Sequence, residues 1–224
     1  MRAESASAFD LSATEYDSWY DSAQGRPVFE SELKCLRSLM PENETPLLEI
    51  GVGTGRFAMY FPGAYGADPA LGALKLAQKR GIRCVNGVGE QLPFRDGAFK
   101  TVLIIATLCF VKRPQSLLQE ASRILSPDGD IIVGFISRSS SWGALYEKKK
   151  KEGSTFYRHA KFYDLPDIKG FAKAAGLCTT SIVSTLLQPP SCSSSVEEPR
   201  NSYVEGAGFI FLRLEKEKGL LGGQ

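Results

Sequence analysis

The residues with the clearest chemical meaning lie between Leu47 and Gly55, in the segment LLEIGVGTG. An apolar run that contains Glu49 passes directly into a turn with glycines at 51, 53 and 55. Glycine has no Cβ, so such a turn can bend sharply out of a strand and bring backbone N–H groups against a ligand, with a helix beginning behind it. The segment predicts the backbone cradle of a nucleotide-type cofactor. A glycine-rich strand-to-helix turn without a ligand is the alternative.

The spacing of the glycines leaves two cofactors to compare. A dinucleotide site of the Rossmann type needs a third glycine three residues after the second, for close helix packing and for access of a pyrophosphate to the helix N-terminus. Arg56 occupies that position. The acid at Glu49, ahead of the first glycine, suits a ligand that carries an ammonium group. The pattern therefore favours S-adenosylmethionine over NAD.

The following segments predict the rest of an adenosine half-site. A helix-like stretch over 56–61 precedes a short strand over 64–67, which ends in Asp68. An acid at that point can accept hydrogen bonds from both ribose hydroxyls, as it also does in NAD sites. Further on, the periodicity predicts a buried strand, a helix, a Pro-Asp-Gly turn and another buried strand. The first strand is Val102–Leu108, and the apolar positions of the helix are Leu117, Leu118, Ala121, Ile124 and Leu125.

Four motifs follow one another along the chain: EIGVGTG at 49–55, Asp68, GEQLPFRDGAFKTV at 89–102 and EASRILSPDGDIIVG at 120–134. Together they resemble class I S-adenosylmethionine-dependent methyltransferases of the small-molecule, ubiquinone/menaquinone-biosynthesis-like type. The resemblance covers roughly residues 10–185. It implies an α/β fold with a Rossmann-like, mostly parallel seven-stranded sheet. The implied strand order is 3-2-1-4-5-7-6, with the last strand antiparallel and helices on both faces.

The resemblance implies a set of cofactor-binding residues. Glu49 would orient the turn and bind the cofactor ammonium, directly or through water, while Asp68 would hold the ribose. Val88 stands where the family often has an Asp, so adenine recognition would rely on backbone atoms and apolar walls. Thr107 would offer its carbonyl to the methionine ammonium. The full implied set is Glu49, Gly51, Gly53, Gly55, Asp68, Gly89, Glu90 and Thr107.

The sequence indicates the catalytic residues less clearly than the cofactor-binding residues. A sulfonium is already a good leaving group, so the protein mainly aligns the acceptor and excludes water, and a general base is optional. The candidates are His159, Cys109 and Tyr16. For His159, a surface residue of a basic stretch is the simpler interpretation. Cys109, expected at the end of the fourth strand, could be a pocket thiol, but a small buried residue is the simpler interpretation.

Aromatic residues in two segments suggest where the acceptor would lie. Tyr16, Trp19 and Tyr20 resemble the opening segment that folds over the cofactor in the quinone-type enzymes; a staple that packs a helix onto the core is the alternative. The insertion at about 137–167 would cover the substrate mouth. Its aromatic residues predict an apolar or planar acceptor pocket, or else core packing. They are Trp142, Tyr146, Phe156, Tyr157, Phe162 and Tyr163, and the substrate-side candidates are Tyr20, Cys109, Tyr157 and His159.

The chain is predicted to form a single domain over residues 1–224, with a cofactor-binding core at about 45–136 and a long loop at about 188–202. Residues 1–12 are expected to be a loose segment without regular secondary structure. An amphipathic helix is expected over 26–40, with Phe29, Leu33, Leu36 and Leu39 on one face. Two strands near the C-terminus, TTSIVSTLL and GAGFIFLRLEK, would form an antiparallel hairpin.

Composition narrows the class of partner. The 27 basic and 25 acidic residues give a net charge of +2, so no nucleic-acid partner is expected. The 5 cysteines form no Cys-x-x-Cys pair, which favours reduced thiols and no metal. The basic run Lys148–Lys151 suggests an anionic substrate or, more simply, a solvated helix face. No signal peptide or membrane span is predicted, and a cytoplasmic location is expected.

The sequence thus predicts an enzyme that transfers a methyl group from S-adenosylmethionine to a small-molecule acceptor by direct in-line displacement. A protein or RNA methyltransferase is one alternative, but TLCF replaces the Asn-Pro-Pro-Tyr type of motif after the fourth strand. A regulatory protein that binds S-adenosylmethionine without turnover is another. A nicotinamide oxidoreductase is opposed by Arg56. The acceptor and the oligomeric state stay open.

Overall fold

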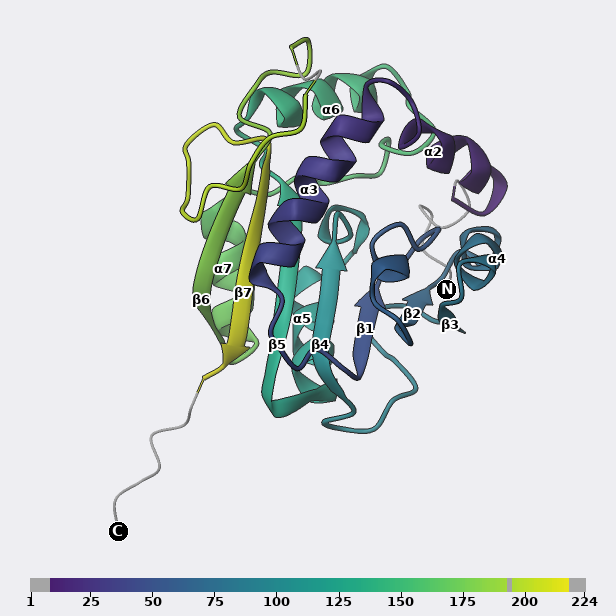
Figure 1. Ribbon diagram of the computed structural model, residues 1–224, viewed down its shortest axis with the longest axis vertical. Helices are drawn as coiled ribbons and strands as arrows, with labels where there is room; N and C mark the ends of the chain where they lie inside the picture. Colours follow the sequence, from purple (N-terminus) through teal and green to yellow (C-terminus); the bar gives the residue numbers. More distant parts are fainter. Residues whose placement is uncertain (1–8, 193–194, 218–224) are drawn as a thin grey trace.

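A seven-stranded sheet forms the centre of the molecule, with helices on both sides (Figure 1). The computed structural model describes residues 9–192 and 195–217. The strands are β1 Leu47–Ile50, β2 Tyr65–Asp68, β3 Arg83–Asn86, β4 Phe99–Ile105, β5 Leu125–Ile136, β6 Leu177–Thr185 and β7 Phe209–Lys216. The helices are α2 Ala13–Trp19, α3 Gly25–Leu39, α4 Leu71–Lys79, α5 Pro114–Ile124, α6 Ser141–Lys151 and α7 Leu165–Ala174, with short 3-10 helices η1 Ala58–Tyr60 and η2 Leu108–Phe110.

The sheet topology confirms the predicted fold. The strand order is β3-β2-β1-β4-β5-β7-β6. The first five of these run parallel, and β7 lies antiparallel to both β5 and β6. Since the chain moves from β1 outward through β2 and β3 and then returns to β4 on the other side, the carboxyl ends of β1 and β4 form a topological switch point. Open α/β sheets bind ligands at such points.

Apolar side chains alternate between the two faces of the sheet, as strand geometry requires. Leu103 and Ile105 of β4 belong to the core cluster under α3 and α4, whereas Val102 and Ile104 belong to the cluster under α5 and α7. In Figure 1, α3 crosses in front of the sheet and α5 and α7 lie behind it. The predicted amphipathic helix is confirmed in α3, whose four predicted face residues are all buried: Phe29, Leu33, Leu36 and Leu39.

Three local predictions were wrong. The glycine turn leads into η1 and not into a helix over 56–61, because Pro62 disfavours a helical residue before it and closes the segment. The fourth strand ends at Ile105, since Ala106 adopts a φ of 50° and turns the chain into η2. The Pro-Asp-Gly segment forms no separate turn. It belongs to β5, which contributes the extra residues where the register against β4 shifts between the pairs Phe99–Leu125 and Thr101–Asp130.

The N-terminal segment also differs from expectation. Phe9–Leu11, within the segment read as loose, is helical, and residues 1–8 lie outside the described residues. The loop at 188–202 is held against its neighbours: the Glu197 carboxylate accepts the Leu187 N–H at 2.7 Å, and the Glu197 N–H donates to Ser31 Oγ at 2.8 Å. Residues 193–194 of this loop are not described. Over the described part of the chain, every helix is too short or too polar to cross a bilayer.

Candidate functional site

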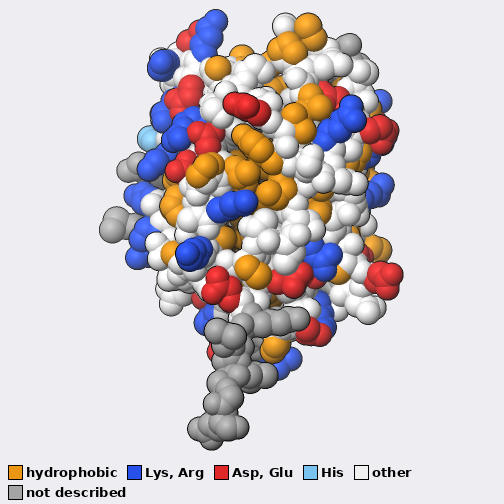
Figure 2. Space-filling model, turned by 90° about the vertical axis from the view of Figure 1, so that its left-hand side faces the viewer, with side chains coloured by type: hydrophobic (Ala, Val, Ile, Leu, Met, Phe, Trp, Pro, Cys, Tyr) orange, Lys and Arg blue, Asp and Glu red, His pale blue; other side chains and the backbone are white. Residues whose placement is uncertain are grey.

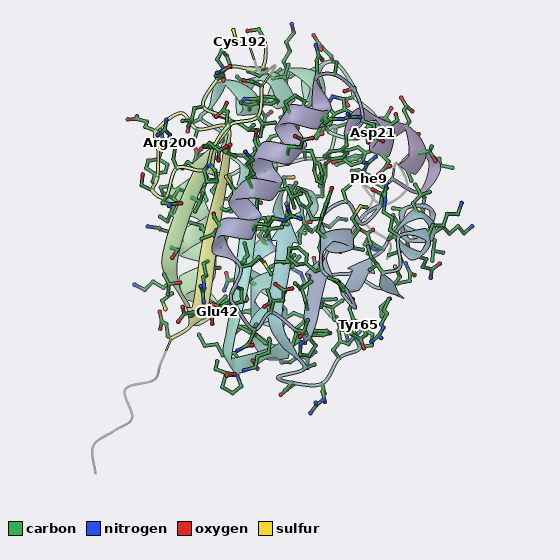
Figure 3. All side chains as sticks on the ribbon, in the orientation of Figure 1. Phe9, Asp21, Glu42, Tyr65, Cys192 and Arg200 are labelled. Atoms are coloured by element: carbon green, nitrogen blue, oxygen red, sulfur yellow. The ribbon has the colours of Figure 1, made fainter. Side chains whose placement is uncertain are left out.

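A cavity of about 540 Å³ lies at the carboxyl ends of the parallel strands, at the switch point. We call it the strand-end cavity. In Figure 3, Phe9 and Asp21 lie beyond these strand ends, whereas Glu42 and Tyr65 lie toward the opposite end of the sheet. The turns after β1, β2, β3 and β4 all contribute to its wall. Of the eight residues predicted to hold a cofactor, seven line it: Glu49, Gly51, Gly53, Asp68, Gly89, Glu90 and Thr107.

The glycines of the turn serve different purposes. Gly51 has a φ of +74°, and a Cβ there would lie 2.3 Å from Thr107 Oγ1, so only glycine lets the turn approach the segment after β4. Gly53 has a φ of +52° and borders open space, since a Cβ would meet no atom within 4 Å. Gly55 lies outside the cavity wall. A Cβ at Gly55 would lie 2.2 Å from Ile82 Cδ1, which makes it a packing residue.

Two buried acids border the turn. Glu49 is 2% exposed, and its carboxyl group accepts the Ala58 N–H at 2.9 Å. Burial raises the pKa of Glu49 to about 8. The Asp68 carboxylate accepts the N–H groups of Gly53 at 2.9 Å and Ala70 at 2.8 Å, while burial raises its pKa to about 6. Because burial disfavours both charges, a ligand with an ammonium group or hydroxyl donors would be favoured here.

The opposite wall comes from the segments after β3 and β4. A Cβ at Gly89 would lie 2.7 Å from Leu117 Cδ1 and 2.8 Å from Ile50 Cγ2, so a larger residue would displace these side chains. Val88, in the position where an Asp is common, forms an apolar part of the wall. The Thr107 carbonyl, predicted to face an ammonium, already accepts the Phe110 N–H at 2.9 Å within η2. One of its two lone pairs is therefore used by the protein itself.

An ion-pair cluster fastens α2 over the glycine turn. The Asp17 carboxylate pairs with Arg56 and Arg80, each at 2.7 Å, and accepts the Thr54 hydroxyl at 2.5 Å. Burial opposes its charge, but the guanidinium groups of Arg80 and Arg56 hold the pKa of Asp17 well below its usual range. Arg56, which the sequence marked only as the missing third glycine, thus holds the segment that carries Tyr16.

A second cavity of about 480 Å³ adjoins the first, and we call it the tyrosine cavity. The two cavities share Tyr16, Tyr20 and Ala106 in their walls. Tyr157 lines only the second one, where its ring packs on that of Tyr146 at a centroid distance of 4.6 Å. The predicted substrate-side residues Tyr20 and Tyr157 therefore lie together with Tyr16.

The remaining predicted candidates lie outside both cavities. Cys109 packs against the core with its Sγ 3.4 Å from the Ala106 carbonyl oxygen, and burial raises its pKa to about 12, which opposes a thiolate role. His159 is exposed. In the described ranges, no group of three or more His, Cys, Asp and Glu side chains is placed to hold a metal ion.

The aromatic residues of the insertion at about 137–167, which was predicted to cover the substrate mouth, lie partly in the tyrosine cavity and partly in the core. Tyr146, Phe156 and Tyr157 line the tyrosine cavity. The remaining aromatic residues of this segment, Trp142, Phe162 and Tyr163, are buried in the core clusters. Of the basic run, only Lys149 lines the tyrosine cavity.

One side chain of the tyrosine cavity escaped the sequence reasoning. Glu32 of α3 is 7% exposed, and among the described residues no hydrogen bond or ion pair reaches its carboxyl group. Burial raises its pKa to about 8. A signal was present, because Glu32 falls on the same helical stripe as Phe29, Leu33 and Leu36, where an acid is out of place.

The fold and the strand-end cavity define an α/β protein that binds a nucleotide-type cofactor, and comparisons with known proteins narrow the class. The "Methyltransferase domain" family matches residues 48–133. A Thermotoga maritima structure described as a SAM-dependent methyltransferase, possible histamine N-methyltransferase, is 35% identical with a TM-score of 0.87, over 95% of this chain and 99% of that one.

Two sequence relatives extend over most of the chain. An uncharacterized protein of Methanocaldococcus jannaschii is 37% identical over 93% of this chain and 98% of its own length. An uncharacterized protein of Mycobacterium tuberculosis is 38% identical over 94% of this chain and 73% of its own length. The chain belongs to the class I S-adenosylmethionine-dependent methyltransferases, and S-adenosylmethionine is its cofactor.

Proposed function

We propose that the protein methylates a small molecule, with S-adenosylmethionine in the strand-end cavity and the acceptor in the tyrosine cavity. The observation that carries this proposal is the shared wall: both cavities are bordered by Tyr16, Tyr20 and Ala106. Donor and acceptor would meet at that junction. A volume of about 480 Å³ lies within the range of roughly 300–1,000 Å³ that is usual for small-molecule sites.

The residues of the strand-end cavity fit the cofactor by their chemistry. Backbone groups at Gly51 and Gly53 would approach its amino acid part, Glu49 would bind its ammonium group, and Asp68 would bind the ribose hydroxyls. When bound, S-adenosylmethionine supplies a methyl group on a sulfonium sulfur, which is a good leaving group. The chain would contribute alignment and exclusion of water, with Tyr16 and Tyr20 closing the junction.

A macromolecular acceptor has less support. Figure 2 shows basic and acidic side chains interspersed on the face that it presents, with no continuous basic surface there. The net charge is only +2. Nucleic-acid partners are usually bound by concentrated positive charge. A cofactor-binding protein without turnover would share the same strand-end cavity, so turnover is what separates it from an enzyme.

The proposal is tested by turnover of the full chain with S-adenosylmethionine and a panel of phenols, thiols and small amines. The Thermotoga maritima relative is described as a possible histamine N-methyltransferase, which supports including amines. We expect release of S-adenosylhomocysteine that depends on one small acceptor, with the methylated product seen by mass spectrometry. Turnover only with protein or RNA, or with no acceptor at all, would contradict the proposal.

Asp68→Ala is predicted to weaken S-adenosylmethionine binding by one to two decades, or roughly 1.5–3 kcal/mol, because it removes a charged hydrogen-bond acceptor from the ribose position. The same change frees the Gly53 and Ala70 N–H groups, so a modest loss of stability should accompany it. Calorimetric titration and thermal unfolding measure the two effects. Asp96→Ala is the control, because Asp96 is an exposed surface acid. Equal affinity in both variants would mean that Asp68 does not contact the cofactor.

A further inference from the structure

The tyrosine cavity contains a carboxyl group with no hydrogen-bond or ion-pair partner among the described residues. Glu32 enters it from α3, the helix that packs on the sheet, and is 7% exposed. An ionised group in such surroundings destabilises a protein unless it is paired. The basic residue in the cavity wall is Lys149, whose Nζ lies over the ring of Tyr146 at 5.2 Å.

The surroundings of Glu32 are aromatic hydroxyl groups. Tyr16, Tyr20 and Tyr146 line the same cavity as Glu32, and burial, with a smaller contribution from the Glu32 charge, raises their pKa values. The hydroxyl groups of Tyr16 and Tyr20 lie 3.3 Å apart. Ring faces attract cations, and hydroxyl oxygens accept hydrogen bonds from them. An unpaired carboxylate within such a cage matches a positively charged ligand.

We infer that Glu32 and the tyrosines around it bind a small amine in its ammonium form and that Glu32 accepts its proton before methyl transfer. This inference rests on the proposed function and names the acceptor class. The cage lies at the junction with the strand-end cavity, because Tyr16 and Tyr20 line both cavities. An amine held by Glu32 would therefore stand beside the position of the transferable methyl group.

The proposed reaction couples proton transfer to Glu32 with methyl transfer to the amine nitrogen. One N–H proton passes from the ammonium to the Glu32 carboxylate, and the freed nitrogen lone pair forms the new N–C bond. The C–S bond of the sulfonium breaks with its electron pair on sulfur. The product is an N-methylated ammonium, and Glu32 returns its proton to water when the product leaves. A carboxyl group whose pKa is raised to about 8 is better suited to this exchange than an ordinary glutamate.

Glu32 has several other titratable groups around it, and the tyrosines and cysteines among them stay uncharged near pH 8. Burial raises the pKa of Tyr16 to about 12 and that of Cys35, on the same helix, to about 12, so both stay neutral near pH 8. Tyr20, Tyr146 and Tyr157 have raised pKa values as well. Glu15 of α2 and Lys149 of α6 also line the cavity. Cys109, which lies outside both cavities, is neutral for the same reason as Cys35.

The test is calorimetric titration of the full chain, saturated with S-adenosylhomocysteine, with 2-phenylethylamine, tryptamine and the uncharged analogue 2-phenylethanol. We expect wild type to prefer an amine over the alcohol, and Glu32→Gln to lose amine affinity roughly 10- to 100-fold. Glu30→Gln is the matched control, since Glu30 is an exposed acid of the same helix. Glu32→Asp, which keeps the charge, should restore part of the amine preference.

The pH profile gives a second readout that a purely structural role would not produce. Amine affinity should rise as Glu32 ionises around pH 8 and fall again when the amine itself loses its proton; Glu32→Gln should lack the rising limb. Equal amine affinity in wild type and Glu32→Gln, or no amine binding by protein that binds S-adenosylhomocysteine, would overturn the inference alone. Failure to bind S-adenosylhomocysteine would instead contradict the proposed function.

Discussion

Replacing Gly51 with alanine should reduce S-adenosylmethionine affinity at least about 100-fold and lower the free energy of unfolding by about 2–4 kcal/mol. Two effects add at this position. A φ of +74° is unfavourable for a residue with a Cβ, and that Cβ would lie within 3 Å of Thr107 Oγ1, Cγ2 and Cβ at once. No rotation of the Thr107 side chain removes its Cβ, so the turn itself must shift away from the cavity.

Gly63→Ala is the matched control for this substitution. Gly63 has a similar φ of +79°, but a Cβ there would meet nothing within 4 Å, and the residue lies outside the strand-end cavity. Gly63→Ala should lower the free energy of unfolding by only about 1 kcal/mol and leave cofactor affinity unchanged. Chemical unfolding and calorimetric titration of both variants give the comparison. If Gly51→Ala bound the cofactor like Gly63→Ala, the glycine turn would not be the binding cradle.

Asp17→Ala should lower the free energy of unfolding by about 2–4 kcal/mol, because it leaves the guanidinium groups of Arg56 and Arg80 without their partly buried counter-charge. It should also slow methyl transfer at least about tenfold, since α2 carries Tyr16 to the junction of the two cavities. Urea unfolding and single-turnover kinetics with saturating cofactor measure the two effects.

Asp21→Ala provides the comparison for Asp17→Ala. Asp21 pairs with the same Arg56 at 2.6 Å, but its side chain is 61% exposed, so its loss should change stability by no more than about 1 kcal/mol. The effect of Asp17 should also depend on pH. Its pKa in the folded protein lies below the unfolded value of about 3.9, so its stabilisation is complete above that pH and disappears as the pH falls further. Similar losses in both variants at neutral pH would contradict the proposed fastening of α2.

The parts of the site that could be predicted from the sequence are those that local sequence determines. Gly51, Gly53 and Asp68 lie within one strand-turn-strand unit, so their spacing alone places them at one edge of the sheet. The end of β4 was not predicted, because Val102–Leu108 is uniformly apolar and the change of direction at Ala106 has no compositional signal.

Residues that depend on tertiary contacts were missed for a different reason. Asp17 and Asp21 are equivalent in the local sequence. The distant residues Thr54 and Arg80, the latter 63 positions from Asp17, contact only Asp17 of the two and make it the buried partner. Glu32 stood on the apolar stripe of α3, but only the folded structure shows that α2 and α6 help to enclose it in a cavity. Tyr157 and His159 belong to a segment without regular periodicity, so the sequence does not show which of them turns toward the cavity.

The most direct test of the central claim is parallel calorimetric titration of the full chain with S-adenosylmethionine, S-adenosylhomocysteine and NAD. The strand-end cavity, with its two acids and without a third glycine at Arg56, predicts binding of both sulfur-containing ligands at about micromolar concentration and no binding of NAD. Binding of NAD alone, or of none of the three by folded protein, would contradict the account.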